Sequence, residues 1–137
     1  MAGQAGTPLA RKLGIKPGHE VALIGAPDGL AGNLGPLPGG VTMSAGLGGT
    51  GPFDVIVAFL RWRRELAEQL PGLRERMAPA CGLWIAWPKR AAQVTTDMTG
   101  DVVREVALPT GLVDNKVCAI DATWTALRLV IRRELRP

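Results

Sequence analysis

Three segments of the chain are apolar at consecutive positions rather than at alternating ones. They span residues 21–24, 54–60 and 83–87, and only Asp54 interrupts them. Continuous apolar runs of this length are typical of parallel strands that are covered on both faces, whereas a half-exposed strand alternates. We therefore predict three neighbouring parallel strands at the centre of a sheet, the first ending at Gly25.

The hydrophobic period changes to that of a helix between the second and third strands. Large apolar residues recur there at steps of three or four, at Trp62, Leu66, Leu70, Leu73 and Met77. This spacing predicts an amphipathic helix. We expect the Pro71-Gly72 pair to kink or divide it. Residues 79–82 then end the helix, and Pro88 stops the third strand.

Two shorter helices are predicted from their end signals. Residues 7–14 have Thr7 as a candidate N-cap, Pro8 in the first turn and Gly14 just past the end. This helix would act as a lid or a brace. Thr99 is a candidate cap for residues 100–108, which carry Asp101 in the first turn and end at Pro109.

The end of the chain predicts a β-hairpin. Residues 112–120 and 124–132 read as strands, and only residues 121–123 connect them. Such a short connection requires antiparallel pairing. Asp121 is expected to brace the turn through its side chain.

Residues 25–52 form the least regular part, because fourteen of these twenty-eight residues are Gly or Pro. We expect turns around a weak strand at 41–43 and a short helical turn near 28–34. Residues 46–51 match Gly-x-Gly-x-x-Gly, but Pro52 and a strand follow instead of a helix. We interpret them as a flexible loop rather than a dinucleotide-binding motif.

Together these elements predict one Rossmann-like α/β domain over residues 1–137, with residues 1–18 as an N-terminal helix and linker. The sheet is expected to be mainly parallel and flanked by helices, with a C-terminal antiparallel hairpin. A length of 137 residues fits one domain, and 47% hydrophobic with 20% charged residues is a globular composition.

The chain is basic, with a formal net charge of +4 and a pI near 9.7. Its adjacent cations form three short groups, at Arg61/Arg63/Arg64, Lys89/Arg90 and Arg132/Arg133/Arg136. We interpret these as solvated helix faces and chain ends. A nucleic-acid partner is disfavoured, because four Trp, two Phe and no Tyr supply a base-stacking platform poorly.

The apolar runs and the cysteine and histidine content of the chain predict its location and the state of its cysteines. No apolar run approaches the roughly 20 residues that span a bilayer, and residues 1–8 contain no hydrophobic signal region. We predict a cytoplasmic protein of bacterial type with no membrane partner. Cys81 and Cys118 are expected to be reduced core residues. With His19 as the single histidine, expected at the surface, a Cys/His zinc site has too few ligands.

Residues 53–57 and 77–85, together with the closing hairpin, resemble the second half of the class I methyltransferase fold. The resemblance covers residues 53–132 and implies a truncated version of that topology. Members of that family hold S-adenosylmethionine with a glycine-rich loop after the first strand and an acidic residue at the end of the second. Here Pro27 removes a donor from that loop, residues 41–45 end without a carboxylate, and a third strand with its helix is missing. No cofactor is therefore predicted, and S-adenosylmethionine is the alternative.

The chain also resembles a small bacterial family, a domain of unknown function. The resemblance rests on residues 6–18 (Gly-Thr-Pro-Leu-Ala-Arg-Lys-Leu-Gly-Ile-Lys-Pro-Gly), on Trp-Pro-Lys at 87–89 and on residues 117–124. It covers nearly the whole chain and implies no activity.

Candidate ligand contacts lie where predicted parallel strands end, since ligands of open α/β sheets gather at the carboxyl ends of the strands. They are Gly25, Ala26, Pro27, Asp28, Trp87, Pro88, Lys89 and Arg90. The Lys and Arg could hold an anion. The structural alternatives are a tight turn that needs glycine and a core Trp beside solvated cations. Trp84 is expected to pack on the opposite face from Trp87.

No Gly-x-Ser-x-Gly, Walker, His-Glu-x-x-His or Cys-x-x-Cys motif occurs, so no catalytic residue and no metal ligand is predicted. The leading hypothesis is a non-catalytic Rossmann-like module that binds a small anionic ligand or a protein partner. The alternatives are a minimal or degenerate S-adenosylmethionine-dependent methyltransferase and, more weakly, nucleic-acid binding through basic patches. A homo-oligomer stays open, because an exposed outer strand can pair with another chain.

Overall fold

The three continuously apolar segments form adjacent parallel strands, as predicted. The computed structural model describes residues 7–48 and 51–136. In it Val21 of the first strand pairs with Val55 of the second, and Val55 pairs with Gly82 of the third. The strands are β1 (Glu20–Ile24), β3 (Phe53–Phe59) and β4 (Met77–Pro88), and the weaker parallel strand β2 (Thr42–Ala45) lies beyond β1.

The end of the chain is the predicted hairpin of β5 (Leu112–Ala119) and β6 (Trp124–Ile131), which is antiparallel and has a register shift between Asp114 and Lys116. β6 pairs antiparallel with β4, which gives the sheet order β2-β1-β3-β4-β6-β5. Asp121 braces the turn as expected, because its Oδ1 accepts the N–H groups of Thr123 and Trp124, each at 2.8 Å.

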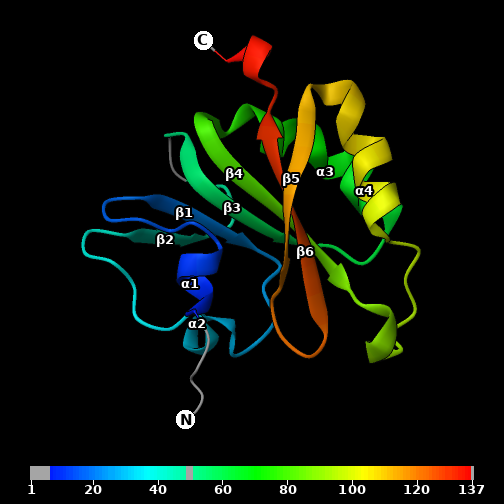
Figure 1. Cartoon of the computed structure of the whole chain (residues 1–137), viewed down its shortest axis with the longest axis horizontal. Helices are drawn as coiled ribbons and strands as arrows, with labels where there is room; N and C mark the ends of the chain where they lie inside the picture. Colours follow the sequence, from blue (N-terminus) through cyan, green and yellow to red (C-terminus); the bar gives the residue numbers. More distant parts are fainter. Residues whose placement is uncertain (1–6, 49–50, 137) are drawn as a thin grey trace.

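Helices cover both faces of the sheet (Figure 1), which confirms the Rossmann-like fold class. One face packs against the two longer helices, α3 (Arg63–Glu75) and α4 (Gly100–Ala107), and the other against α1 (Leu9–Lys12) and α2 (Leu30–Asn33). Three short 3-10 helices, η1 (Arg90–Ala92), η2 (Leu108–Thr110) and η3 (Arg133–Leu135), complete the elements described.

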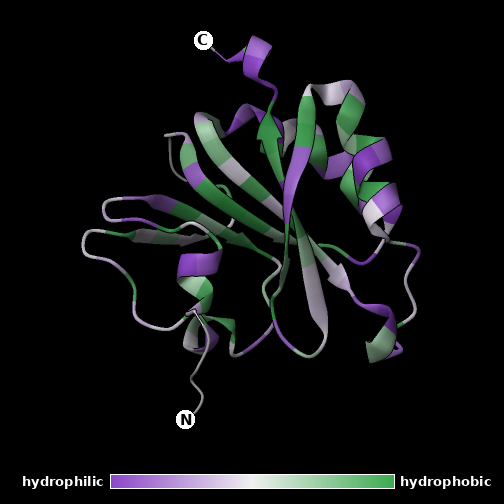
Figure 2. Ribbon diagram, viewed as in Figure 1, coloured by the Kyte–Doolittle hydropathy of each residue, from purple (hydrophilic) through white to green (hydrophobic). Residues whose placement is uncertain are grey.

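Burial on both faces explains why the central strands are apolar at every position. Ile56 and Ala58 pack into the α3/α4 face, whereas Val55 and Val57 pack into the α1/α2 face. All four are at most 2% exposed. Each large apolar side chain buried in this way contributes about 1.5–3 kcal/mol. Figure 2 shows hydrophobic residues along the central strands, a mixture of hydrophobic and hydrophilic residues on the helices, and hydrophilic residues in the C-terminal segment.

Of the two expected effects of Pro71-Gly72, a kink or a division of the long helix, the division is wrong, since α3 continues through Pro71 to Glu75. Proline removes one helical hydrogen bond, whose acceptor here would be the carbonyl of Ala67. Leu66, Leu70 and Leu73 lie on the buried side of α3 at 0–1% exposure, and this packing holds the helix together. Met77, expected on the helix, belongs to β4.

Two element boundaries also differ from the predictions. Thr7 is not the N-cap of α1, because Pro8 occupies that position and no side chain caps it. Residues 79–82, expected to end the helix before the third strand, instead lie within β4. The β3/β4 register shifts between the Phe53–Met77 pair and the Val55–Gly82 pair, so Pro79 falls in an irregular stretch where no ladder bond is required.

The remaining helix end agrees with prediction. The Thr99 hydroxyl accepts the N–H of Val102 at 3.1 Å, and Asp101 lies in the first turn of α4. The helix ends at Ala107 and passes into η2, where Pro109 lies.

Trp84 connects α1 to the sheet. Its side chain is 0% exposed and packs on the α1/α2 face, opposite Trp87, as expected from their spacing. The indole Nε1–H donates to the carbonyl of Leu13 at 3.0 Å. Because this carbonyl lies just beyond the last residue of α1, the contact fixes the helix as a brace over the sheet.

Both cysteines are free and buried, as expected of core residues. Burial raises the pKa of Cys81 to about 12, and it also raises the pKa of Cys118. None of the helices in the described residues has both the length and the apolar character needed to cross a bilayer.

We predict that Trp84→Phe lowers the free energy of unfolding by about 1–3 kcal/mol, because it removes a buried hydrogen bond and leaves a small cavity. Urea denaturation measures the change. Trp62→Phe is the matched control, since the half-buried Trp62 packs under Arg61 and its substitution should cost less. Equal effects of the two substitutions would contradict the bracing role.

The thiol of Cys81 should be inert in the folded protein at neutral pH, because its raised pKa leaves almost no reactive thiolate. Cys118 should react slowly, and both should react at once after unfolding in guanidinium. Titration with Ellman's reagent, with Cys118→Ala to separate the two thiols, measures this. Rapid reaction of Cys81 in the native protein would show that the strand around it opens.

Candidate functional site

The carboxyl ends of the parallel strands define the first place to look for a site. β1, β3 and β4 run in the same direction, so Gly25 and Lys89, which follow β1 and β4, lie at the same edge of the sheet. The chain reaches β2 on one side of β1 and β3 on the other. Ligands of open α/β sheets bind where the strand order reverses in this way, which here is next to the end of β1.

Gly25 allows the chain to turn sharply at that point. Its φ is +66°, a left-handed conformation that side chains disfavour. A Cβ there would also lie 3.1 Å from the carbonyl oxygen of Phe59, at the end of β3. The tight-turn interpretation of this glycine therefore holds.

A hollow of about 710 Å³ opens beside this turn, and we call it the carboxyl-edge hollow. The end of β1, the loop into α2 and the end of β2 enclose it. Its lining residues are small or apolar except for Ser44, and they are Leu23, Ile24, Gly25, Ala26, Pro27, Gly29, Leu30, Ala31, Met43, Ser44, Ala45 and Gly46. No charged side chain lines it, so its chemistry consists of apolar contacts, one hydroxyl and backbone groups.

Three of the four predicted residues after β1 line this hollow. Gly25, Ala26 and Pro27 do so, whereas Asp28 is exposed and does not. Sequence reasoning did not select Met43, Ser44 or the other lining residues of β2. The weak strand predicted at residues 41–43 could have identified them, because a strand parallel to β1 must end at the same edge of the sheet as β1.

The second predicted group lies at the same edge but does not line the hollow. Trp87 is 9% exposed and packs into the α3/α4 core, and Pro88 is buried. The backbone N–H of Lys89 donates to the carbonyl of Thr123 at 2.8 Å, and Arg90 is exposed at the start of η1. This arrangement matches the structural alternative of a core Trp beside solvated cations.

The segment after η1 closes the end of β3 between these two groups. The Thr96 hydroxyl donates to the carbonyl of Arg61, and the Asp97 Oδ1 accepts the N–H of Arg63 at 2.7 Å. The Glu65 Oε1 accepts the N–H groups of Arg61 and Trp62, at 2.9 and 3.0 Å. Two carboxylates thus occupy the backbone donors of Arg61, Trp62 and Arg63, and their negative charge disfavours an anionic ligand at the start of α3.

The glycine-rich segment 46–51 does not form a dinucleotide motif. Gly46 lines the carboxyl-edge hollow, and β3 begins at Phe53 instead of a helix. Of the loop expected over residues 46–51, residues 46–48 and 51 belong to no helix or strand, and Gly49 and Thr50 lie outside the described residues. Because only residues 46–52 separate β2 from β3, no further strand and helix fit between them.

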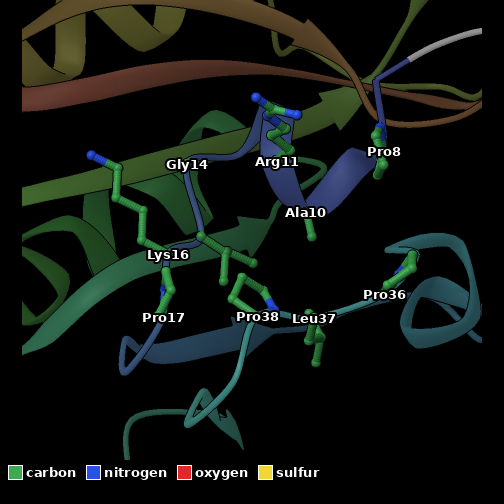
Figure 3. A pocket seen from close by; sticks show the side chains of 10 residues that line it. Pro8, Ala10, Arg11, Gly14, Lys16, Pro17, Pro36, Leu37 and Pro38 are labelled. Atoms are coloured by element: carbon green, nitrogen blue, oxygen red, sulfur yellow. The ribbon is translucent and has the colours of Figure 1, made fainter.

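A second hollow, of about 600 Å³, lies between α1 and the segment before β2 (Figure 3). Its lining is dominated by prolines and apolar residues, with Leu37 43% exposed. Arg11 and Lys16 also line it, but the Lys16 side chain is directed away from Pro17 and Pro38 (Figure 3). None of its lining residues belongs to a strand, so it does not lie at the carboxyl ends where open α/β sheets bind ligands, and the carboxyl-edge hollow is the stronger candidate.

Comparison with solved structures identifies the same fold in methyltransferases. The chain is similar to the ribosomal protein L11 methylase from Lactobacillus delbrueckii subsp. bulgaricus, with a TM-score of 0.59 and 11% identity over 90% of this chain and 75% of that one. It is also similar to the magnesium protoporphyrin IX methyltransferase from Synechocystis with bound S-adenosylmethionine, with a TM-score of 0.60 and 10% identity over 90% of this chain and 74% of that one.

Fibrillarin from Aeropyrum pernix, in complex with natively bound S-adenosyl-L-methionine, gives a TM-score of 0.60 and 15% identity over 85% of this chain and 68% of that one. Likenesses at such low identity establish a class I methyltransferase-like, Rossmann-like layout. No protein-family model and no curated protein matches the sequence. The resemblance to a small bacterial family therefore stays a prediction.

We predict that Gly25→Ala lowers the free energy of unfolding by about 1–3 kcal/mol, because alanine is strained at positive φ and would contact the Phe59 carbonyl. Gly32→Ala is the control. Gly32 lies within α2 with nothing within 4 Å of a Cβ, so alanine should stabilise the protein by about 0.4–1 kcal/mol. Urea denaturation compares them, and a neutral Gly25→Ala would contradict the tight approach of β1 to β3.

Proposed function

We propose that this chain is a non-catalytic binding module whose carboxyl-edge hollow takes the nucleoside part of an S-adenosyl compound. The observation that carries the proposal is the position of this hollow, at the carboxyl ends of β1 and β2 and next to the point where the strand order reverses, in a fold shared with proteins solved with bound S-adenosylmethionine. A volume of about 710 Å³ lies within the range of small-molecule sites.

The lining of the hollow fits a flat, uncharged group. The partly exposed Leu23 and Met43 offer apolar surfaces to the faces of a base, and methionine sulfur interacts favourably with aromatic rings. Gly25 and Gly29 let a ligand approach the backbone closely. The Ser44 hydroxyl is the polar side chain among the lining residues and can donate or accept one hydrogen bond.

The same lining accounts for two departures from a strong cofactor site. β2 ends at Ala45, so no carboxylate is available at this position to accept hydrogen bonds from ribose hydroxyls. No cation lines the hollow, so an anionic group adds nothing to its selectivity. We therefore expect recognition of the base and a modest affinity.

The proposal of a non-catalytic role rests on the absence of titratable side chains from the lining of the hollow. General acid–base catalysis needs such a group within hydrogen-bond reach of the reacting atoms. Methyl transfer to a reactive acceptor can proceed through alignment alone. A minimal methyltransferase is accordingly the second candidate, and the shared fold with methyltransferases favours it.

Calorimetric titration with S-adenosylhomocysteine tests the binding. We expect saturable binding by the wild-type chain and its loss in Ala31→Trp, because Ala31 lines the hollow and an indole there would fill it. Ala67→Trp is the matched control, since Ala67 is likewise an exposed alanine on a helix but lies on α3, away from the hollow. No heat with the wild-type chain, or equal loss in both variants, would refute the proposal.

A turnover assay distinguishes the minimal methyltransferase from the non-catalytic binding module. With S-adenosylmethionine and a fractionated cell extract as the source of acceptors, a binding module should produce no more S-adenosylhomocysteine than the extract alone. Production that depends on the chain and disappears in Ala31→Trp would establish the methyltransferase instead.

A further inference from the structure

Cations from separate parts of the chain converge at the opposite edge of the sheet, near the amino ends of β1 and β3. They surround a cleft of about 330 Å³, which we call the amino-edge cleft. α1, the loop before β1, the start of β3 and the hairpin enclose it. Its lining residues are Lys12, Gly14, Lys16, His19, Asp54, Val55, Ala80, Lys116 and Arg128.

The charge of this cleft is strongly one-sided. Three of the four lysines in the chain line it, together with Arg128. The one carboxylate in the lining is that of Asp54, and its Oδ2 already accepts the backbone N–H of Glu20 at 2.9 Å. The cleft therefore concentrates positive charge that its own residues leave largely uncompensated.

In the described part of the chain, no carboxylate forms a salt bridge with these four cations. In the described residues, salt bridges within 4.0 Å join Arg63 to Glu105, Arg104 to Asp101 and Asp114, and Arg132 to Glu134. None of the four cations of the amino-edge cleft takes part in one. Their mutual repulsion in the free protein is a cost that a bound anion would remove.

Two of the cations are direct neighbours across the hairpin. Lys116 of β5 is in register with Arg128 of β6. Like charges directly opposite each other destabilise a pair of antiparallel strands. A bound anion between the two cations would relieve this repulsion.

Contacts with β4 and β5 define the position of the Arg128 guanidinium. It lies over Gly82 of β4, where the Cβ of any other residue would be 2.9 Å from Nη2 and 3.0 Å from Cζ. Its Nη1 also donates to the Asn115 Oδ1 at 3.3 Å. The absence of a side chain at Gly82 thus leaves room for the Arg128 side chain beside β4. Among the described residues, no carboxylate holds the guanidinium in this position.

His19 adds an oriented ring to the same cleft. Its Nδ1 accepts the backbone N–H of Lys16 at 3.1 Å. In the neutral ring the proton therefore lies on Nε2, and His19 can serve as a hydrogen-bond donor. The half-buried ring and the cations supply donors only, which suits an acceptor-rich ligand.

We infer that the amino-edge cleft binds a compact phosphate-bearing anion, such as pyrophosphate or the phosphate groups of a small phosphorylated molecule. Lysine ammonium groups hold phosphate as point charges, and a guanidinium pairs with it in bidentate fashion. A volume of about 330 Å³ fits a small anion rather than an extended chain. None of the lining residues is a Trp or Phe, so the cleft has no surface for stacking nucleic-acid bases.

Calorimetric titration with pyrophosphate at low ionic strength tests this site. We expect saturable binding of one pyrophosphate per chain, weakened about tenfold by Lys116→Gln and at least as much by Arg128→Gln, since each removes a charge-assisted hydrogen bond. Lys89→Gln is the matched control, because it removes the same charge from the one lysine outside the cleft and should leave the affinity unchanged. Circular dichroism confirms folding, and the exposed Lys116 can be replaced without disturbing the core.

Three results would overturn the inference. They are an absence of saturable pyrophosphate binding, an equal loss in Lys89→Gln, and tight binding of a single-stranded oligonucleotide that Lys116→Gln weakens while pyrophosphate does not compete. The last would assign the cleft to a nucleic-acid backbone. Ala31→Trp should bind pyrophosphate normally, which separates this site from the carboxyl-edge hollow.

Discussion

Burial of the central strands on both faces is the constraint from which the rest of the structure follows. A strand as apolar as β3 must be covered on two sides, and the connections that supply the covering helices also return the chain so that the next strand runs in the same direction. β1, β3 and β4 therefore begin at one edge of the sheet and end at the other. Both candidate sites lie at these edges, outside the core.

The two edges differ in chemistry because different segments supply them. At the carboxyl edge, small residues at the ends of β1 and β2 leave a hollow without charged side chains, while Asp97 and Glu65 close the end of β3. At the amino edge, α1 and the hairpin bring cations together from positions more than a hundred residues apart in the sequence. An uncharged nucleoside suits the first environment and a phosphate suits the second. The small anionic ligand expected from the sequence therefore fits the amino-edge cleft better than the carboxyl-edge hollow.

Local patterns predicted most of the fold. Continuous apolar runs identified β1, β3 and β4. Thr99 and Asp121 identified the start of α4 and the hairpin turn, because each bonds to backbone groups only two or three residues away. The errors arose where tertiary packing outweighs local preference, as at Pro71, where buried leucines hold α3 together. At the sites, the loop after β1 could be predicted from strand order. The amino-edge cations could not, because their register and the space over Gly82 appear only in three dimensions.

The register shift in β5 bears on how copies of this chain meet in concentrated solution. β5 is an outer strand whose backbone could template a neighbour, and Val117 is 63% exposed on it. The irregular stretch beside Lys116 interrupts the flat row of donors and acceptors that such templating requires. Antiparallel pairing of two β5 strands in a register centred on Lys116 would also bring the two ammonium groups together. The register shift and the lysine together disfavour regular edge-to-edge pairing along β5.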